Sequence, residues 1–432
     1  MRQSSQNSVC LIPRIDLHTG YHGTLLRDPP EGVRFLVSDC DHLFLMKTDD
    51  RSPYQSAHVG EFIETASKQQ VTHSARWPVL GSSSWVADTD DLMYPIMCGR
   101  TSYDPKFQAK LRSDDADFRQ MLRQRSVNMI TAYLHSSCRS ILVSGQPRIS
   151  VDTAREWFDN LKISPEGEDL LAKIQIVRPA QKSADRKSVE EKWKQLNKIR
   201  VVFCGRDFDI KNGLLALHVF ARLRNEFAEL EFIYIGPIPN DITVASPELL
   251  HGVIHYAELD HDSTLQIMQN SHVLFHPSKF DSIGIVMLEA MAAGMAVVTA
   301  RGQGMDYVDD FFDGGGALLI DRGKVNSSAE ALAFEAALRS LALDPQLMES
   351  MGFRNYDLVA KGEYSISHQN EKLSEIYRCA RNSSALPLQI SDLPFVKGFK
   401  TLRMSSQDVK AEERSFRRGS NLTGNGFLSV TL

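Results

Sequence analysis

The sequence predicts an α/β protein made of two doubly wound domains, each with a parallel sheet covered by helices. At 432 residues the chain is long enough for two domains that each bury a core. From about residue 199 onward, short apolar runs alternate with helical patterns, which is typical of a parallel sheet with helices on its faces. Similar but less regular apolar runs occur in the first half.

The second half carries the more regular pattern. Its expected strands are rich in Val, Ile and Phe, which suits strands buried on both faces. They lie at residues 199–205, 231–236, 252–256, 272–277, 296–300 and 317–320. Helical patterns fall between them, at residues 212–227, 262–270 and 285–294. This half therefore predicts a doubly wound domain.

The first half predicts a second, irregular α/β unit. Strand-like runs occur at residues 33–37, 84–87, 140–144 and 173–177. Residues 115–136 place their large apolar side chains on one helical stripe. Thr153 to Glu156 and Ser188 to Glu191 match the S/T-x-x-E box that opens a helix.

These patterns divide the chain into four parts. We expect a first domain over 1–180, a lysine-rich linker over 181–198, a second domain over 199–384 and a polar tail over 385–432. The linker is expected to serve as part of a hinge between the domains. The tail lacks periodicity, so it is either disordered or laid across the other domain.

Composition excludes several classes of function. A net charge of -5 argues against nucleic acid as a partner. The six cysteines are dispersed, and no Cys/His cluster has metal-ligand spacing, so no metal site is expected. The longest apolar stretch, 284–300, contains Glu289 and is too short to span a membrane. The first 15 residues lack the apolar run of a signal peptide, which favours a cytoplasmic protein; peripheral membrane association is the alternative.

The loop after the first strand of the second half carries two cations. Residues 205–213 read GRDFDIKNG, so Arg206 and Lys211 stand in one short segment before a helix. A guanidinium fork and a mobile ammonium suit a diphosphate. The alternative is two solvated charges offset by Asp207 and Asp209.

A second cluster follows the strand at 272–277. Asp281 and Glu289 stand eight positions apart, one in a loop and the other inside a helix. Gly284 allows close approach to the backbone, and the free N–H groups of 283–286 form an anion site at the helix start. Glu289 interrupts an apolar helix, which costs free energy unless the carboxylate has a partner such as a ribose. The alternative is that Asp281 caps the helix and Glu289 pairs with a neighbouring cation.

Three motifs within 199–320 resemble the C-terminal domain of glycosyltransferase family 4, the retaining group 1 enzymes of the GT-B fold. GRDFDIKNG resembles the donor-phosphate loop G-R-x-x-x-x-K-G, with Asn212 inserted before the last glycine. PSKFDSIGIVMLEAMAAGMAVV resembles the signature that contains the E-x7-E pair, and DGGGALLI resembles its D-G-x-x-G-x-L-V ending. Asp281 replaces the first acid of the pair, Ile283 the usual aromatic residue and Ala296 the usual proline.

The resemblance implies two Rossmann-like domains facing a central cleft and a hexosyltransferase of the EC 2.4 class. Arg206 and Lys211 would bind the donor diphosphate, Glu289 the ribose, and Asp281 the transferred sugar; Asp281, Arg206 and Lys211 are the expected catalytic residues. The implied donor-binding set is Gly205, Arg206, Lys211, Asp281, Ser282, Ile283, Gly284, Ile285 and Glu289. The nucleotide sugar is a co-substrate, so no cofactor and no metal are expected. The acceptor is a saccharide, a lipid or a protein.

The first half offers acceptor-side candidates, namely Asp88, Asp90 and Asp91, against an alternative of turn-forming acids. Gly20-Tyr21-His22-Gly23 is either a glycine-rich loop beneath the sugar or, as the favoured reading, a surface turn. Two other functions stay open. One is a metal-dependent GT-A transferase, with Asp88 and Asp90 or the pair in Asp39-Cys40-Asp41 as its DxD acids. The other is a transferase-derived protein that binds nucleotide sugars with little or no turnover.

Overall fold

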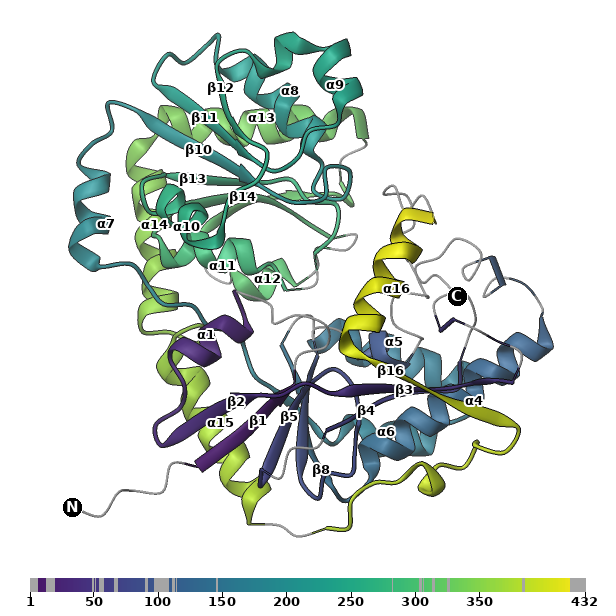
Figure 1. Cartoon of the computed structure of the whole chain (residues 1–432). Helices are drawn as coiled ribbons and strands as arrows, with labels where there is room; N and C mark the ends of the chain where they lie inside the picture. The colour runs from purple at the N-terminus through teal and green to yellow at the C-terminus, as the bar shows by residue number, and fades with distance from the viewer. Residues whose placement is uncertain are drawn as a thin grey trace, which may run out of the picture. The chain divides into compact units, whose positions relative to one another are not determined.

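The computed structural model describes most of the chain and divides into two compact units (Figure 1). The residues described are 7–12, 20–48, 50, 52–53, 58–65, 69–89, 92–96, 109–110, 113, 115–144, 147–281, 283–302, 305, 307–312, 315–324, 327–382 and 385–419. The first unit comprises the described residues within 1–18, 25–178 and 370–432. The second unit comprises those within 19–24 and 179–369.

The second unit contains a parallel sheet with the strand order β12-β11-β10-β13-β14-β15. Its strands are β10 (Ile199–Cys204), β11 (Leu230–Ile235), β12 (Val253–Tyr256), β13 (Val273–His276), β14 (Ala296–Arg301) and β15 (Ala317–Asp321). All six match the runs expected from the sequence. The order steps outward from β10 in both directions, so the adjacent strands β10 and β13 form the switch point at which ligands bind in such sheets.

Helices cover both faces of this sheet because its strands are apolar on both sides. On one face Val201 and Phe203 pack with Phe220, and on the other Val202 packs with Met287. The first face is covered by α8 (Gly213–Leu223) and α13 (Ser327–Leu343), and the second by α10 (His261–Gln269), α11 (Ile285–Ala292) and α12 (Val308–Phe311). The unit also contains α7 (Arg186–Trp193), α9 (Asn240–Ala245), η2 (Pro247–Leu250) and α14 (Pro345–Ala360).

The first unit contains two sheets. The larger is parallel, with the order β2-β1-β5-β7-β8-β9, and the smaller has the order β16-β3-β4-β6. The strands of the larger sheet are β1 (Asn7–Ile12), β2 (Val33–Val37), β5 (Val71–Ala75), β7 (Trp85–Thr89), β8 (Cys138–Val143) and β9 (Ile174–Ile176). Those of the smaller are β3 (Asp41–Lys47), β4 (Gly60–Glu64), β6 (Val79–Leu80) and β16 (Phe399–Ser405). The smaller sheet was not expected from the sequence.

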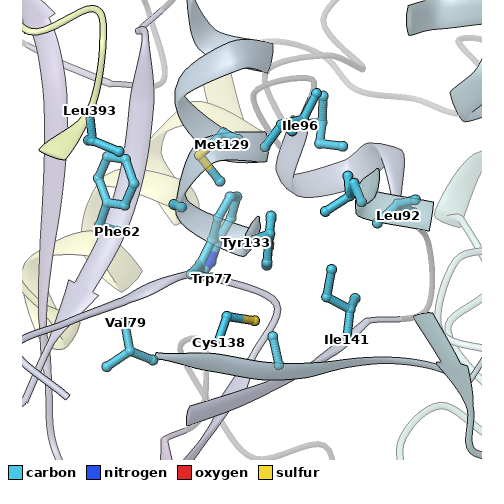
Figure 2. Close-up of a cluster of buried hydrophobic side chains, with 14 of the residues drawn as sticks. Phe62, Trp77, Val79, Leu92, Ile96, Met129, Tyr133, Cys138, Ile141 and Leu393 are labelled. Carbon is cyan, nitrogen blue, oxygen red and sulfur yellow. The ribbon is translucent and has the colours of Figure 1, made fainter. Parts of the chain in front are cut away.

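The core of the first unit lies between these sheets and a long helix. The helix α4 (Ala116–Leu134) matches the predicted stripe, and Asp115 caps it by accepting from the N–H of Phe118. Figure 2 shows Met129 and Tyr133 of α4 near Trp77 and Cys138 within the buried cluster. The unit's other helices in this part are α2 (Met93–Ile96), α5 (Pro147–Leu161) and α6 (Ser164–Leu171), and the division between the two units falls within α1 (His22–Arg27). Among the described residues, no helix is both long and apolar enough to cross a membrane.

The C-terminal segment belongs to the first unit, which differs from the expected boundary at residue 384. Its elements are α15 (Ile366–Arg381), η3 (Ile390–Asp392), β16 and α16 (Ser406–Gly419). Strand β16 pairs antiparallel with β3 along seven residue pairs, and Tyr377 of α15 is fully buried against the larger sheet. Of the two expectations for the tail, the described part fits the one in which it lies on the other domain.

The expected linker is not a free connection. Its helix α7 packs into the second unit through Val189 and Trp193, so most of 181–198 is part of that unit. Asp185 caps α7 by accepting from the N–H of Ser188, so the predicted box at Ser188 is wrong. The box at Thr153 is also wrong, because that residue lies inside α5.

We predict that the tail stabilises the first unit through Leu393, which is 3% exposed and lies beside Phe62 (Figure 2). Leu393→Ala should lower the unfolding free energy of this unit by about 2–5 kcal/mol, the usual loss for a buried leucine. Hydrogen exchange of the first unit's strands during urea unfolding measures this value. Leu386→Ala, at a tail residue that is 82% exposed, is the control and should change little. Equal effects of the two changes would contradict the prediction.

Candidate active site

The loop after β10 is shaped by one glycine and one aspartate. A side chain at Gly205 would lie 2.6 Å from Cγ of Lys211, so glycine leaves room for the lysine stem. Asp207 accepts from the N–H of Ile210 at 3.0 Å, which turns the chain toward α8. Asn212 then adopts a left-handed conformation, with φ of 59°, before the helix begins at Gly213. The loop therefore holds Lys211 against the end of the sheet, while Arg206 is exposed.

The loop after β13 is joined to this first loop and to a buried arginine. The N–H of Lys279 donates to the carbonyl of Ile210 at 2.8 Å, which fastens the two loops together. Arg322, which is 8% exposed, donates to the carbonyls of Ser278 at 2.6 Å and Pro277 at 2.8 Å. Its remaining nitrogen, Nε, pairs with Glu330 at 2.8 Å. Arg322 thus fixes the backbone from which Asp281 projects.

Lys211, Asp281 and His276 form one cluster at the carboxyl ends of β10 and β13. Lys211 Nζ lies 2.7 Å from Asp281 Oδ2, and the two side chains are 19% and 18% exposed. His276 Nε2 lies 3.4 Å from the same oxygen, and that imidazole is 1% exposed. The other carboxylate oxygen, Oδ1, accepts from the N–H of Gly284 at 3.3 Å.

The cluster keeps the carboxylate charged. Burial opposes ionisation of Asp281, but Lys211 and then His276 outweigh it and hold the pKa of Asp281 well below its ordinary value. Burial lowers the pKa of His276, and the neighbouring carboxylate only partly offsets this effect. Near pH 7 the site therefore contains a charged Asp281 carboxylate beside a neutral His276 imidazole.

Gly284 begins α11 in a conformation that suits glycine. Its φ is 66°, and a side chain there would lie 2.5 Å from both Tyr307 Oη and Met287 Cε. Glycine therefore leaves room for Tyr307 and Met287 beside the N-terminus of α11, the end of a helix that favours anions.

Glu289 lies in the second turn of α11 and has a partner from another helix. Its Oε1 is 2.7 Å from Nε2 of His261, the first residue of α10, and its side chain is 8% exposed. Cys204, at the end of β10, is influenced by the charge of Glu289. Burial and then the Glu289 carboxylate raise the pKa of the Cys204 thiol to about 12, while Lys211 and Arg206 act in the opposite direction. Lys211, Arg206 and Glu289 therefore share one electrostatic environment.

The structure thus brings together Gly205, Lys211, Asp281, Ile283, Gly284, Ile285 and Glu289 at one edge of the second sheet. Ser282 lies outside the described residues. In this ligand-free structure Asp281 accepts from the N–H of Gly284, the residue before the first turn of α11, and Glu289 pairs with the imidazole of His261. The roles toward a donor remain predictions.

Among the acceptor-side candidates of the first half, Asp88 is buried. Asp88 is 4% exposed, 3.8 Å from His73, and His73 bonds the hydroxyl of Tyr377 at 2.6 Å. This carboxylate is therefore turned into the first unit rather than to its surface; Asp90 and Asp91 lie outside the described residues.

Two further segments of the first half also had expected roles. Asp41, a DxD candidate, is the first residue of β3 and pairs with Arg403 of the tail at 2.8 Å, while Asp39 lies in the loop between β2 and β3. The segment Gly20–Gly23 is not the exposed turn that was favoured, because Gly20, Tyr21 and His22 are buried and Gly20 accepts from Gln181.

Sequence reasoning missed four residues of this site, namely His261, His276, Tyr307 and Arg322. His276 lies near the end of a predicted strand, and His261 directly precedes a predicted helix, so position alone offered a weak signal for both. Nothing in the local sequence around Arg322 marks it, because its partners are carbonyls 44 and 45 residues away.

A groove in the second unit is separate from this site. The groove, of about 420 Å³, is lined by Arg200, Glu231, Tyr256, Gln266 and other residues near β12 and α10, and no donor-site candidate lines it. Within the described part of the chain, no group of three or more His, Cys, Asp or Glu side chains is arranged to hold a metal ion.

Residues 198–335 match the family model described as glycosyl transferases group 1. The chain carries a group 1 glycosyltransferase domain. The matched range contains β10 through most of α13, and with them both loops of the site. The narrower assignment to family 4 stays a prediction.

Similar proteins support this group 1 domain and the fold. The chain is 27% identical over 210 residues to alpha-maltose-1-phosphate synthase of Mycolicibacterium smegmatis, a match that covers 46% of this chain and 53% of the relative. The chain spans about half the length of the curated relatives it matches.

Solved structures of other proteins resemble most of the chain. The catalytic domain of starch synthase IV from Arabidopsis thaliana, bound to ADP and acarbose, has a TM-score of 0.51 at 11% identity, covering 88% of this chain and 100% of that one. Anabaena HepE in complex with UDP has a TM-score of 0.50 at 12% identity, covering 86% and 99%. With its two parallel sheets, the chain has the GT-B fold.

We predict that Gly284 is required both for its conformation and for the space beside it. Gly284→Ala should destabilise the second unit by more than the roughly 1–2 kcal/mol of a left-handed residue, because the new methyl group meets Tyr307. Gly302→Ala is the matched control, since Gly302 has φ of 73° and nothing within 4 Å of the added carbon. Thermal unfolding of the two variants measures the difference, and equal losses would refute a role for the crowding.

Proposed function

We propose that this protein is a retaining glycosyltransferase that moves a sugar from a nucleotide-sugar donor to an acceptor without a metal ion. One observation carries the proposal: Lys211, Asp281, the start of α11 and Glu289 converge at the carboxyl ends of β10 and β13. This edge offers a cation and free N–H groups for a diphosphate, and carboxylates for the hydroxyl groups of a ribose and a sugar.

The main task of the site is electrostatic. As the bond between sugar and phosphate breaks, negative charge develops on the departing diphosphate. Lys211, Arg206 and the N-terminus of α11 would stabilise that charge, and the departing phosphate would help to deprotonate the acceptor on the same face of the sugar. Such a front-face route retains the anomeric configuration and needs no cofactor.

Glu289 is the proposed ribose ligand. His261 engages Oε1 and no described contact engages Oε2, so one oxygen of the carboxylate stays available to a vicinal diol. Since the side chain is only 8% exposed, a hydrogen bond to it would be well shielded from water.

The similar proteins agree with a nucleotide-linked donor. One solved structure with this fold is bound to ADP and another to UDP, and the curated relative is named as a synthase of a sugar phosphate. The base, the sugar and the acceptor of this protein are not assigned from them. The acceptor-side candidates Asp88, Asp90 and Asp91 also stay proposals.

A second candidate function is a nucleotide-sugar-binding protein with little turnover. The observation that favours it is the engagement of Asp281, which stands one methylene shorter than glutamate and has partners at both oxygens. Hydrolysis or transfer of a bound donor above background separates the two candidates. The metal-dependent GT-A alternative loses support, because the chain has a second complete parallel sheet.

We predict that charge reversal in the first loop weakens donor binding. Lys211→Glu or Arg206→Glu should reduce affinity at least about tenfold, because each removes a charge-assisted hydrogen bond worth about 1.5–3 kcal/mol. The ligand is the nucleotide sugar that raises the melting temperature most in a panel of UDP-, GDP- and ADP-sugars.

Lys198→Glu is the control for the charge-reversal experiment. Lys198 precedes β10 at the opposite edge of the sheet and is 62% exposed, so its reversal should leave affinity unchanged. Wild-type affinity in both loop variants would argue against the proposed diphosphate site. Activity lost in EDTA and restored by manganese would favour a metal-dependent route.

We predict that Glu289 binds the donor and does not act as the base. Glu289→Gln keeps the shape and should weaken binding by about 1–3 kcal/mol, while turnover at saturating donor stays close to that of the wild type. Glu335→Gln, at another buried and paired glutamate of this unit, is the matched control for stability. Loss of all turnover with normal donor binding would show that the assigned role is wrong.

The stereochemical part of the proposal has its own measurement. An α-linked donor should give an α-linked product, because substitution occurs on the face from which the phosphate departs. NMR of the anomeric proton in the product reads the configuration directly, and a β-linked product would overturn the retaining assignment.

A further inference from the structure

Lys211 has two possible uses in the proposed donor site, and they compete. In the ligand-free structure its ammonium lies 2.7 Å from Asp281, and both side chains are about one-fifth exposed. A diphosphate that recruits Lys211 must draw it away from this carboxylate. Arg206 faces no such competition, because its side chain is exposed and forms no hydrogen bond or ion pair within the described residues.

Moving Lys211 would remove a cation from the Asp281 carboxylate, which is about one-fifth exposed. A partly buried carboxylate that loses its cation must be hydrogen-bonded or hydrated. The phosphate charge would also repel it. A group that can hold Asp281 without a net charge therefore has a clear physical use here.

His276 has the position and chemistry for that use. Its Nε2 is 3.4 Å from Asp281 Oδ2, a distance that a small rotation shortens to a hydrogen bond. Its Nδ1 has no hydrogen-bond partner among the described residues, and the ring is 1% exposed. Burial keeps the imidazole neutral near pH 7, so it can donate one proton without adding charge.

We propose that Lys211 exchanges partners when the donor binds, leaving Asp281 for the diphosphate, and that His276 is the positioning residue that then holds Asp281 toward the transferred sugar. The inference rests on the proposed function and deepens it. Asp281 is needed to recognise the sugar, but its pairing with Lys211 weakens the binding of the diphosphate. Asp281 therefore lowers the affinity for a nucleoside diphosphate without a sugar, while it contacts the sugar of the complete donor.

If Lys211 exchanges partners, Asp281→Asn should bind the nucleotide more tightly but turn over the nucleotide sugar more slowly. With no carboxylate to hold it, Lys211 is free for phosphate, so this variant should bind UDP, GDP or ADP, whichever the wild type binds, about fivefold more tightly. Its turnover of the nucleotide sugar should fall at least tenfold. Asp209→Asn is the control, because it removes the same charge from an exposed position two residues from Lys211. Equal tightening in the control would reduce the effect to general electrostatics and overturn the exchange.

His276 is tested by removal and rescue. His276→Leu should leave affinity for the nucleoside diphosphate within twofold of the wild type but lower kcat at least tenfold. His276→Gln, whose amide can donate near the position of Nε2, should restore most of that kcat. A purely structural role predicts instead that both variants lose stability and nucleotide affinity together, and that outcome would overturn the proposal.

The outcomes separate this inference from the function on which it rests. A wild-type protein whose melting temperature rises with none of the UDP-, GDP- and ADP-sugars overturns both. A wild type that binds and turns over a donor, together with an Asp281→Asn variant that binds the nucleotide no more tightly, overturns the exchange alone. Tightening in Asp281→Asn but not in Asp209→Asn, with rescue by His276→Gln, supports the full proposal.

Discussion

The ion pair between Lys211 and Asp281 links the two loops on which the candidate site depends. One partner follows β10 and the other follows β13, so the pair joins adjacent strands that lie about 70 residues apart in the chain. Its strength comes from partial burial, which weakens the screening that makes most surface pairs contribute little. Because Asp281 also accepts from the start of α11, the pair also fixes the helix end that would face an anion.

The rest of the second unit supports this pair mainly through contacts to the loop backbone. Arg322 holds two carbonyls of the Asp281 loop, and the N–H of Lys279 fastens that loop to the first one. Glycine at 205 and 284 leaves space where the lysine stem and a tyrosine hydroxyl come close to the backbone. Buried backbone groups need hydrogen-bond partners, so these contacts also satisfy a loop that would otherwise be costly to bury. The chemical groups are therefore few, and most of the surrounding residues serve to place them.

In the first unit, the C-terminal tail supplies a strand of the smaller sheet and part of the core. Strand β16 covers the edge of β3, and Leu388 and Leu393 enter the same core as Trp77. An uncovered edge strand invites pairing with another chain, so this cover has a physical benefit. Asp88 and His73 lie on the same unit's central strands, where Asp88 approaches one ring nitrogen of His73 and Tyr377 of α15 bonds the other. A carboxylate in that setting is more closely tied to the packing of α15 than its place in a D-x-D triplet suggested.

The sequence by itself determined the six strands of the second sheet, the long helix α4 and the loops that carry Arg206, Lys211, Asp281 and Glu289, because buried parallel strands and amphipathic helices leave local periodic patterns. Only the tertiary structure decided that Lys211 neutralises Asp281, that His276 and His261 contact the two acids, and that α7 and the tail pack into the two units. Contacts between residues far apart in the chain leave no local pattern, and β3, β4 and β16 are stabilised by such pairing. Their assignment depends on which partners meet, and folding alone decides that.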